Sequence, residues 1–365
     1  MAGLMEKLKK NSQIKDIATL DESIYFVEKD MIMTDVPMVN VGLSGKLDGG
    51  LTPGLTVLAG PSKHFKTSFA LLMAAAYQKK YKEAVILFYD SEFGSPRSYF
   101  EAYGIDTSRV LHVPIMDIEE LKFDIMSQLS AITRKDNVII VVDSIGNLAS
   151  KKEVEDAKDQ KSVADMTRAK SLKGLFRMIT PYLTKFDIPM LAVNHTYQTM
   201  EMFSKAVVSG GTGITYSADN IWIIGRRQTK NGTEVVGYDF IINVEKSRFV
   251  KEKSKIPISV SWEGGIEKYS GIFDLGISFN YIIKTGSRYQ LMDLVSGEIE
   301  EAKLWRKGIP DTFFESLVNH EPFKEQVMKQ YMIGYKTELA EDFLNSIPST
   351  ADDEYEEEEA NKEDE

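Results

Sequence analysis

A phosphate-binding loop is the clearest chemical signal in the sequence. The run Gly60-Pro61-Ser62-Lys63-His64-Phe65-Lys66-Thr67-Ser68 follows an apolar segment and precedes a stretch of good helix formers. In that context backbone N–H groups wrap phosphates, and the helix N-terminus adds partial positive charge. The pattern G-x-x-x-x-G-K-[ST] predicts that Lys66 reaches the β- and γ-phosphates of ATP and that Thr67 ligates Mg²⁺. Phe65 stands where the second glycine is usual, and a capped helix start is the competing interpretation.

Three more polar residues lie just past apolar runs. Asp143 is expected to bind Mg²⁺ or its waters, with a turn or helix N-cap as the alternative. Glu92 could orient and activate the attacking water, and Asp90 is its rival for that role. His195 could sense the γ-phosphate and signal to the loop that follows; the alternative is a structural histidine.

Alternating strands and helices are needed to bring these residues together. Ligands of such α/β sheets bind at the carboxyl ends of the strands, which is where the polar residues fall. The apolar runs predict strands at 55–59, 85–89, 138–142, 190–193, 221–224 and 240–244, and the helical patterns fall at 68–77, 119–133, 172–179 (closed near Pro181) and 323–331. We therefore expect an α/β fold with a central, mostly parallel sheet.

Two segments inside this core, 149–164 and 196–215, read as long loops. Long loops in compact domains are usually functional or disordered. Lysines and free glycine N–H groups suit phosphates, and aromatic side chains stack on bases. A third candidate for DNA binding is a basic helix face that carries Lys170 and Arg177; the alternative is that this face is simply exposed to solvent. The candidate DNA-binding residues are Lys151, Lys152, Lys170, Arg177, Tyr197, Phe203, Lys205, Gly210, Gly211, Thr212 and the pair Arg226 and Arg227.

Composition limits the function classes. The chain has 365 residues and no cysteine, so disulfides and thiolate metal sites are excluded. No apolar run approaches the roughly 18 residues of a membrane span, and we expect a cytoplasmic protein without a membrane partner. The net charge is −11, but residues 352–365 hold ten acids against one lysine, so the rest carries only −2. Overall acidity therefore does not exclude nucleic acid as a partner.

With these motifs in place, the sequence resembles the RecA-type strand-exchange recombinases, and among them the UvsX-type recombinases of large tailed bacteriophages. The resemblance extends from about residue 26 to about residue 331. It rests on Gly60–Lys66, Phe88-Tyr89-Asp90-Ser91-Glu92-Phe93-Gly94, the segment 143–152, Val193-Asn194-His195-Thr196-Tyr197 and Glu201-Met202-Phe203-Ser204-Lys205. Phe65 fits the phage subgroup.

The resemblance implies roles for further residues. Glu92 would activate water, Tyr99 would stack on adenine, and Trp262 and Gly265 would lie near the base. His195 stands where RecA itself carries a glutamine, a departure shared with the phage group. Lys246 and Arg248 match two lysines that reach the ATP of the next subunit; arginine keeps the charge but changes the geometry.

The resemblance also implies an organisation and partners. Residues 1–41 would form an N-terminal helix and a polymerisation arm, 42–264 the RecA-like P-loop ATPase core, 265–345 a small C-terminal α/β subdomain and 346–365 an acidic disordered tail. Segments 149–164 and 196–215 would be the two DNA-binding loops. The protein would form a helical filament on single-stranded DNA and exchange strands with double-stranded DNA, aided by a mediator and a single-strand-binding protein.

Two other classes share the phosphate loop and the carboxylates. A RecA-core helicase or motor would separate strands; the N-terminal arm and the 196–215 segment argue against it. A nucleotide-binding regulator that does not hydrolyse ATP is disfavoured by Glu92, if that residue lies at the site.

Overall fold

A single mixed sheet forms the centre of the protein, as the sequence predicts. The computed structural model describes residues 2–25, 27, 29–159, 167–199 and 205–335. In this part of the chain the main sheet has nine strands in the order β11-β10-β9-β8-β1-β5-β4-β2-β3. Their bounds are β1 Gly54–Ala59, β2 Val85–Asp90, β3 Val110–Pro114, β4 Val138–Asp143, β5 Pro189–Asn194, β8 Asn220–Asn231, β9 Glu234–Lys246, β10 Lys255–Ser261 and β11 Gly265–Ile266. All six predicted strands are present.

The register brings the carboxyl ends of the parallel strands to one edge. Strands β3, β2, β4, β5, β1 and β8 pair in parallel, and β9 to β11 extend the sheet antiparallel. Asp90 lies opposite Asp143, and Ala59 lies opposite Asn194. The loops that follow β1, β2, β4 and β5 therefore open on the same edge, where a ligand of an α/β sheet is expected.

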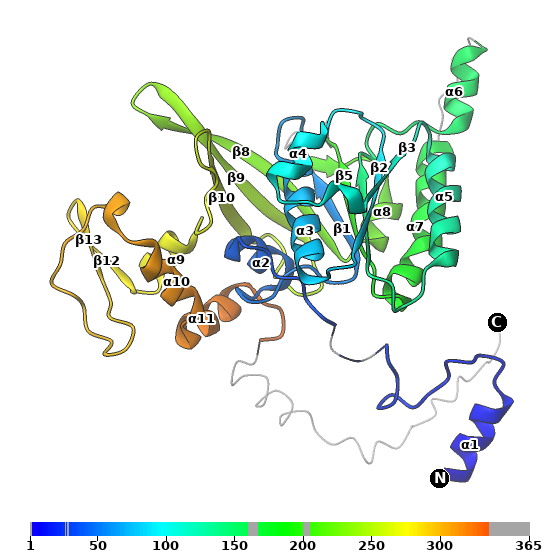
Figure 1. Ribbon diagram of the computed structural model, residues 1–365, viewed down its shortest axis with the longest axis horizontal. Coiled ribbons are helices and arrows are strands. Elements are labelled where there is room, and N and C mark those ends of the chain that lie inside the picture. The colour runs from blue at the N-terminus through cyan, green and yellow to red at the C-terminus, as the bar shows by residue number, and fades with distance from the viewer. Residues whose placement is uncertain (1, 26, 28, 160–166, 200–204, 336–365) are drawn as a thin grey trace, which may run out of the picture. The chain divides into compact units, whose positions relative to one another are not determined.

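Helices cover both faces of the sheet (Figure 1). One face carries α2, α3 and α4, and the other carries α5, α7 and α8, as the two separate clusters of buried side chains show. The strands are buried on both faces, which explains their continuous apolar sequences. The helix bounds are α2 Pro37–Ser44, α3 Lys66–Lys80, α4 Arg97–Ala102, α5 Ile118–Ala131, α7 Thr167–Lys185 and α8 Thr212–Ser217.

Helix α7 does not close at Pro181, contrary to the sequence prediction. Pro181 lies inside the helix, which ends at Lys185. The ring removes one helical hydrogen bond, but buried side chains lie on both sides of it, from Leu172 to Leu183. Burial of this stripe outweighs the missing bond, so the helix continues.

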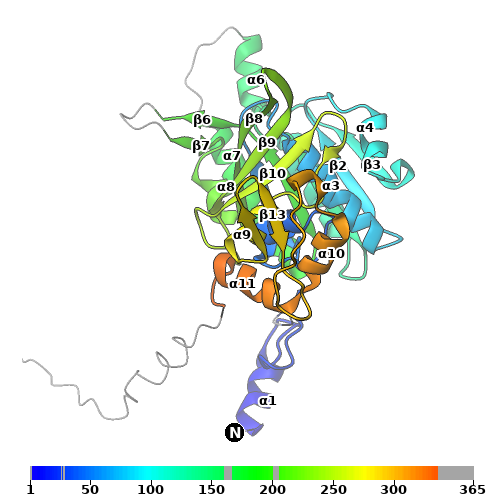
Figure 2. The ribbon, with the colours of Figure 1, turned by 90° about the vertical axis from the view of Figure 1, so that its left-hand side faces the viewer.

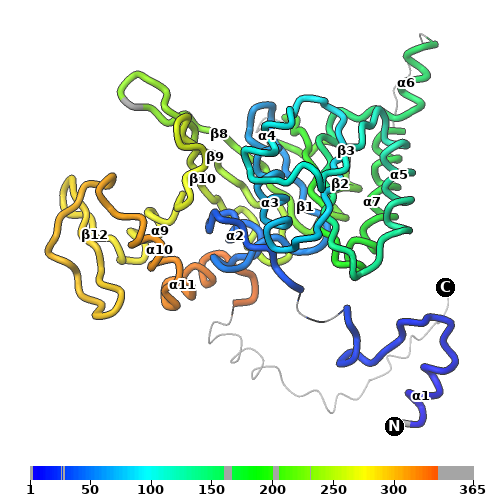
Figure 3. Tube along the Cα trace, in the orientation of Figure 1, coloured from blue at the N-terminus to red at the C-terminus, as the bar shows by residue number. Residues whose placement is uncertain are grey.

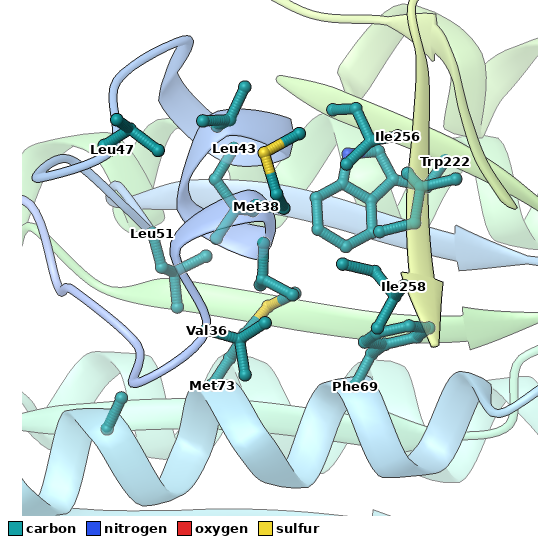
Figure 4. Close-up of a cluster of buried hydrophobic side chains, with 14 of the residues drawn as sticks. Val36, Met38, Leu43, Leu47, Leu51, Phe69, Met73, Trp222, Ile256 and Ile258 are labelled. Carbon is teal, nitrogen blue, oxygen red and sulfur yellow. The ribbon is translucent and has the colours of Figure 1, made fainter. Parts of the chain in front are cut away.

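Helix α2 belongs to the core rather than to an outlying arm. Every residue from Pro37 to Ser44 is buried. Figure 4 shows its side chains between α3 below and Trp222 and Ile256 of the sheet. The indole N–H of Trp222 donates to the carbonyl of Gly42 at 3.2 Å. The predicted boundary between residues 41 and 42 therefore cuts through a core helix, and the core begins before it.

The C-terminal elements continue the same core. They are α9 Ile272–Ser278, β12 Ile282–Thr285, β13 Arg288–Leu291, α10 Asp311–Asn319 and α11 Glu321–Tyr331 (Figure 3). Their buried side chains, such as Leu317 and Phe323, join the cluster that holds Trp222. Residues 1–333 form one compact unit, so the described elements from 265 to 333 belong to the same unit as the strands of the main sheet. The acidic tail lies outside the described residues.

The N-terminal segment contacts the core through ion pairs. It begins with α1, Ala2–Asn11, whose Leu4 and Leu8 are exposed. Asp16 pairs with Lys185 at 2.8 Å, and Lys29 pairs with Asp187 at 2.5 Å. The Asp16–Lys185 pair is exposed and screened by water, and the Lys29–Asp187 pair is only partly buried. These contacts therefore hold the segment far less firmly than burial holds α2.

Among the described helices, none combines the length and the apolar content that crossing a bilayer requires.

Candidate nucleotide and DNA site

The loop between β1 and α3 has the geometry of a phosphate loop despite its missing glycine. A side chain at Gly60 would begin 2.9 Å from the carbonyl oxygen of Ile224. Phe65 has φ 63°, in the left-handed region where glycine is usual. Its ring stacks on Phe240 at 4.9 Å and meets Phe69 edge-on at 5.5 Å. These ring contacts offset the backbone strain, which explains why phenylalanine is tolerated there.

A pocket of about 320 Å³ opens over this loop at the carboxyl edge of the sheet. It collects most of the residues that the sequence assigns to nucleotide and catalysis. Its lining includes Ser62, Lys63, His64, Phe65, Lys66, Thr67, Ser68, Asp90, Glu92, Tyr99, Asp143 and His195.

Lys66, Thr67 and Asp143 form the floor of the pocket. The Lys66 ammonium donates to the carbonyl of Pro61 at 2.8 Å, and burial lowers the pKa of this lysine. Thr67 Oγ1 donates to Asp143 Oδ2 at 2.8 Å. Burial raises the pKa of Asp143 to about 6, although the Thr67 hydrogen bond opposes the shift. A nearby cation would favour the ionised form of this buried carboxylate.

The residues present fit Mg²⁺. Asp143 Oδ1 is buried and has no hydrogen-bond partner within the described residues. A carboxylate and a hydroxyl oxygen are ligands that Mg²⁺ accepts, with phosphate oxygens and waters completing its octahedron. The described part of the chain holds no cluster of three His, Cys, Asp or Glu side chains suited to a metal.

Glu92 and Asp90 are distinguished by their hydrogen bonds. Glu92 Oε1 accepts from Ser144 Oγ at 2.7 Å and from Asn147 Nδ2 at 2.8 Å, and its side chain remains partly exposed to the pocket. Asp90 is buried, and its Oδ1 accepts the backbone N–H groups of Glu92 and Phe93. The geometry thus favours Glu92 as the residue that can reach a water.

His195 lies beside Glu92, between the end of β5 and the hairpin that begins at Thr196. Its Nε2 is 3.4 Å from Glu92 Oε1, and its carbonyl accepts the N–H of Ser209 at 2.9 Å. A side chain at Gly146 would begin 2.3 Å from the His195 ring. Glycine at position 146 therefore allows the ring to approach the Glu92 carboxylate.

Of the three residues expected near the base, one lines the pocket and two do not. Tyr99 lines the pocket, and its hydroxyl hydrogen-bonds Ser68 Oγ. Trp262 and Gly265 lie instead at the hairpin of β10 and β11, outside the residues that line the pocket. Trp262 is 63 % exposed and its ring is 6.4 Å from that of Tyr238. In the single chain they do not contribute to this site.

The two arginines predicted to bind DNA are engaged elsewhere. Arg226 Nη1 donates to the carbonyl of Lys63 in the phosphate loop at 3.1 Å, and its guanidinium lies over the Tyr238 ring at 4.6 Å. Arg227 pairs with Asp239 at 3.0 Å. The structure thus places Arg226 beside the nucleotide pocket rather than beside the predicted DNA loops.

Lys246 and Arg248 also lie away from the pocket of their own chain. Lys246 Nζ donates to the carbonyl of Thr215 at 2.8 Å, next to the end of α8. Arg248 forms an ion pair with Asp219, whose Oδ2 accepts the N–H of Leu55 at the start of β1. Both cations are therefore available only to a ligand outside this chain's own nucleotide pocket.

The first predicted DNA loop is partly helical. Residues Lys151–Lys158 form α6, which begins with a capping box between Ser150 and Glu153. Lys151 and Lys152 lie in its first turn and are exposed. Residues 160–164 of this segment lie outside the described part of the chain. The loop prediction is corrected because an S-x-x-E capping box starts a helix there.

The second predicted DNA loop also contains ordered elements. Strands β6 (Thr196–Gln198) and β7 (Ala206–Val208) form an antiparallel hairpin (Figure 2), and α8 begins at Thr212. Tyr197 and Lys205 are exposed at this hairpin, whereas Phe203 lies outside the described residues.

Two glycines of this segment serve packing. A side chain at Gly210 would begin 2.9 Å from Leu172 Cδ1, and one at Gly213 would begin 2.7 Å from Lys173. These contacts bring α8 close to α7. Gly211 and Thr212 are exposed at the start of α8, and Lys170 and Arg177 are exposed on α7. The predicted basic face therefore exists on the outer side of α7.

Sequence reasoning missed four residues that shape the site: His112, Ser144, Asn147 and Arg226 in its role at the phosphate loop. Ser144 and Asn147 come just after Asp143, the last residue of β4, so their position after a strand end could have pointed to them. His112 carries no such signal, because it lies inside an edge strand and reaches the site only through the pairing of β2 with β3.

Comparisons with known proteins identify the family. The RecA N-terminal domain model matches residues 15–267. The chain is 47% identical over 340 residues to the "Recombination and repair protein" of Enterobacteria phage T4, covering 92% of this chain and 87% of that one. It is 27% identical to Protein RecA of Bacteroides thetaiotaomicron (82% and 88% covered) and 26% identical to Protein RecA of Symbiobacterium thermophilum (82% and 85%). The chain belongs to the RecA family.

Proposed function

We propose that the protein is a DNA-dependent ATPase and strand-exchange recombinase. It forms a helical filament on single-stranded DNA and pairs it with homologous double-stranded DNA in recombination, repair and recombination-dependent replication. The observation that carries this proposal is the contact between Glu92 in the nucleotide pocket and His195, which immediately precedes the β6–β7 hairpin. Family membership and the similarity to a phage recombination and repair protein support it.

Hydrolysis follows from the residues of the pocket. ATP binds with its phosphates in the loop of residues 60–68, where Lys66 faces the β- and γ-phosphates. Mg²⁺, held by Thr67 and Asp143, would neutralise phosphate charge. Glu92 accepts a proton from a water molecule while the oxygen of that water attacks the γ-phosphorus. The bond to the β-phosphate oxygen then breaks, giving ADP and inorganic phosphate.

Nucleotide state is transmitted to DNA through His195. This side chain lies in the pocket 3.4 Å from Glu92 Oε1, and its backbone carbonyl accepts the N–H of Ser209 just after the hairpin. A change at His195 on hydrolysis would thus move the β6–β7 segment. Exposed cations on α6 and α7, with Tyr197 and Lys205, would grip the DNA backbone and stack on bases. Such contacts leave base edges free for homologous pairing.

The filament completes the site. Lys246 and Arg248 would reach the ATP of the neighbouring subunit, and the N-terminal segment would pack on it. This explains why both cations lie outside their own pocket. Trp262 and Gly265 would meet a base across the same boundary. A mediator and a single-strand-binding protein are further proposed partners, and the host cytoplasm is the proposed compartment.

The test is phosphate release by the purified protein with and without single-stranded DNA, beside Glu92→Gln. The variant keeps the size of the side chain but removes its ability to accept a proton. We expect DNA to stimulate hydrolysis and the variant to lose at least about a hundredfold in kcat. DNA-independent turnover, or turnover that survives in the variant, would contradict the proposal. Separation of strands on forked DNA would instead indicate a motor.

A further inference from the structure

We propose that Asp90 and His112 form a pair that positions Glu92, in a chain of contacts that runs from the edge strand β3 to the reacting water. The inference rests on the proposed function, because it concerns the same hydrolysis. Asp90 is the last residue of β2 and is only 5 % exposed. Its role begins with the turn that leads from this strand to Glu92.

One oxygen of Asp90 fixes the backbone of that turn. Oδ1 accepts the N–H of Glu92 at 3.0 Å and the N–H of Phe93 at 2.8 Å. A carboxylate that bonds N–H groups two and three residues ahead closes an Asx turn. The turn sets the direction in which the Glu92 side chain leaves the main chain.

The other oxygen of Asp90 is held from the neighbouring strand. His112 Nε2 is 3.2 Å from Asp90 Oδ2. His112 pairs with Phe88 in the register of β2 and β3, and its ring lies 6.2 Å from the Phe88 ring at an interplanar angle of 29°. A buried carboxylate oxygen without a donor is costly. His112 therefore keeps Asp90 in the one rotamer that serves the turn.

Glu92 is thus located from both of the strands that flank β2. Strand β3 sets its backbone through His112 and Asp90, and the segment after β4 holds its carboxylate through Ser144 and Asn147. The position of a general base matters because a misplacement of about 1 Å can cost a hundredfold in rate. Both oxygens of Asp90 already have partners, Oδ1 with the turn and Oδ2 with His112. Asp90 and His112 therefore act on the reaction by positioning Glu92.

The surroundings of His112 make this proposal testable. A cavity of about 340 Å³ opens beside the ring, between β3 and α4. Shorter amide side chains therefore fit there without overpacking. Glutamine can place its Nε2 near the position of the imidazole Nε2, whereas asparagine reaches only the position of Nδ1. The two variants form a matched pair that differs in the donor to Asp90.

The experiment measures kcat and KM for ATP with saturating single-stranded DNA, together with the affinity for a non-hydrolysable ATP analogue. We expect His112→Asn to lower kcat by about tenfold to a hundredfold, with KM and analogue affinity within about twofold of the unmodified protein. We expect His112→Gln to restore kcat to within about threefold. Equal kcat values for the two variants, at any level, would overturn the role of His112.

A double variant tests whether Asp90 acts through Glu92. Asp90→Ala should lower kcat in the unmodified protein but cause no further loss when Glu92 is already glutamine, measured in single turnovers. Multiplying losses would overturn this part of the proposal. If the unmodified protein shows no DNA-stimulated hydrolysis, both the proposed function and the proposed role of the Asp90–His112 pair fail. If Glu92→Gln behaves as expected and His112→Asn is unaffected, only the pair fails.

Discussion

Replacing Phe65 by glycine or by alanine should reverse the usual order of these two residues. In a helix, glycine is less stable than alanine by about 1 kcal/mol. At Phe65, φ is 63°, so an alanine retains a left-handed strain of about 1–2 kcal/mol that glycine does not carry. We therefore expect Phe65→Gly to be about 1 kcal/mol more stable than Phe65→Ala.

The size of the loss from the unmodified protein follows from the ring contacts. Phe65 is half-buried, so removing its ring forfeits about 1–2 kcal/mol of the 1.5–3 kcal/mol that full burial contributes. Its stack on Phe240 adds about 0.5–1.5 kcal/mol. Phe65→Ala should thus lose about 2–3 kcal/mol of unfolding free energy, and Phe65→Gly about 1–2 kcal/mol.

Lys63 supplies the matched control. It has φ 62° in the same loop, but its side chain is exposed and has no ring contacts. Lys63→Gly should therefore stabilise the protein by about 1 kcal/mol, and Lys63→Ala should change little. Subtracting the Lys63 effect from the Phe65 effect isolates the contribution of the ring.

The assay is urea unfolding followed by circular dichroism in the absence of nucleotide. An alanine variant of Phe65 that equals or exceeds the glycine variant in stability would refute the strain argument. A glycine variant as stable as the unmodified protein would refute the ring argument.

Three further outcomes follow from the structure. Arg226→Ala should raise KM for ATP about tenfold with kcat nearly unchanged, because the guanidinium supports the Lys63 carbonyl; a fall in kcat alone would contradict this. Gly146→Ala should lower DNA-stimulated kcat by at least tenfold while ATP still binds, since its Cβ would displace the His195 ring. Deleting 352–365 should strengthen DNA binding at low salt, measured by fluorescence anisotropy; equal affinity with and without the tail would sink this idea.

Strands and the phosphate loop could be read from the sequence because their signals are local. A continuous apolar run such as 138–142 is typical of a strand inside a sheet that is covered on both faces. The loop before Lys66 carries its chemistry in consecutive residues. The polar residues after β1, β2, β4 and β5 met at one edge because parallel register requires it.

The rest depended on pairings between distant segments. His112 reaches Asp90 only because β3 lies next to β2, and Arg226 reaches the phosphate loop only because β8 lies next to β1. No local pattern encodes those neighbours. The boundary predicted at residue 41 likewise falls inside α2, where the carbonyl of Gly42 accepts the indole N–H of Trp222, far along the chain.

The central place of β1 also bears on when the nucleotide pocket can form during synthesis. Its partners are β5 and β8, so Gly54 pairs with Pro189 and Thr56 pairs with Asn220. Until those later strands leave the ribosome, β1 has neither neighbour, and the loop that follows it has no fixed edge. A nascent chain that ends before β8 should therefore be unable to hold ATP, and its apolar β1 would be exposed to aggregation or chaperones during that interval.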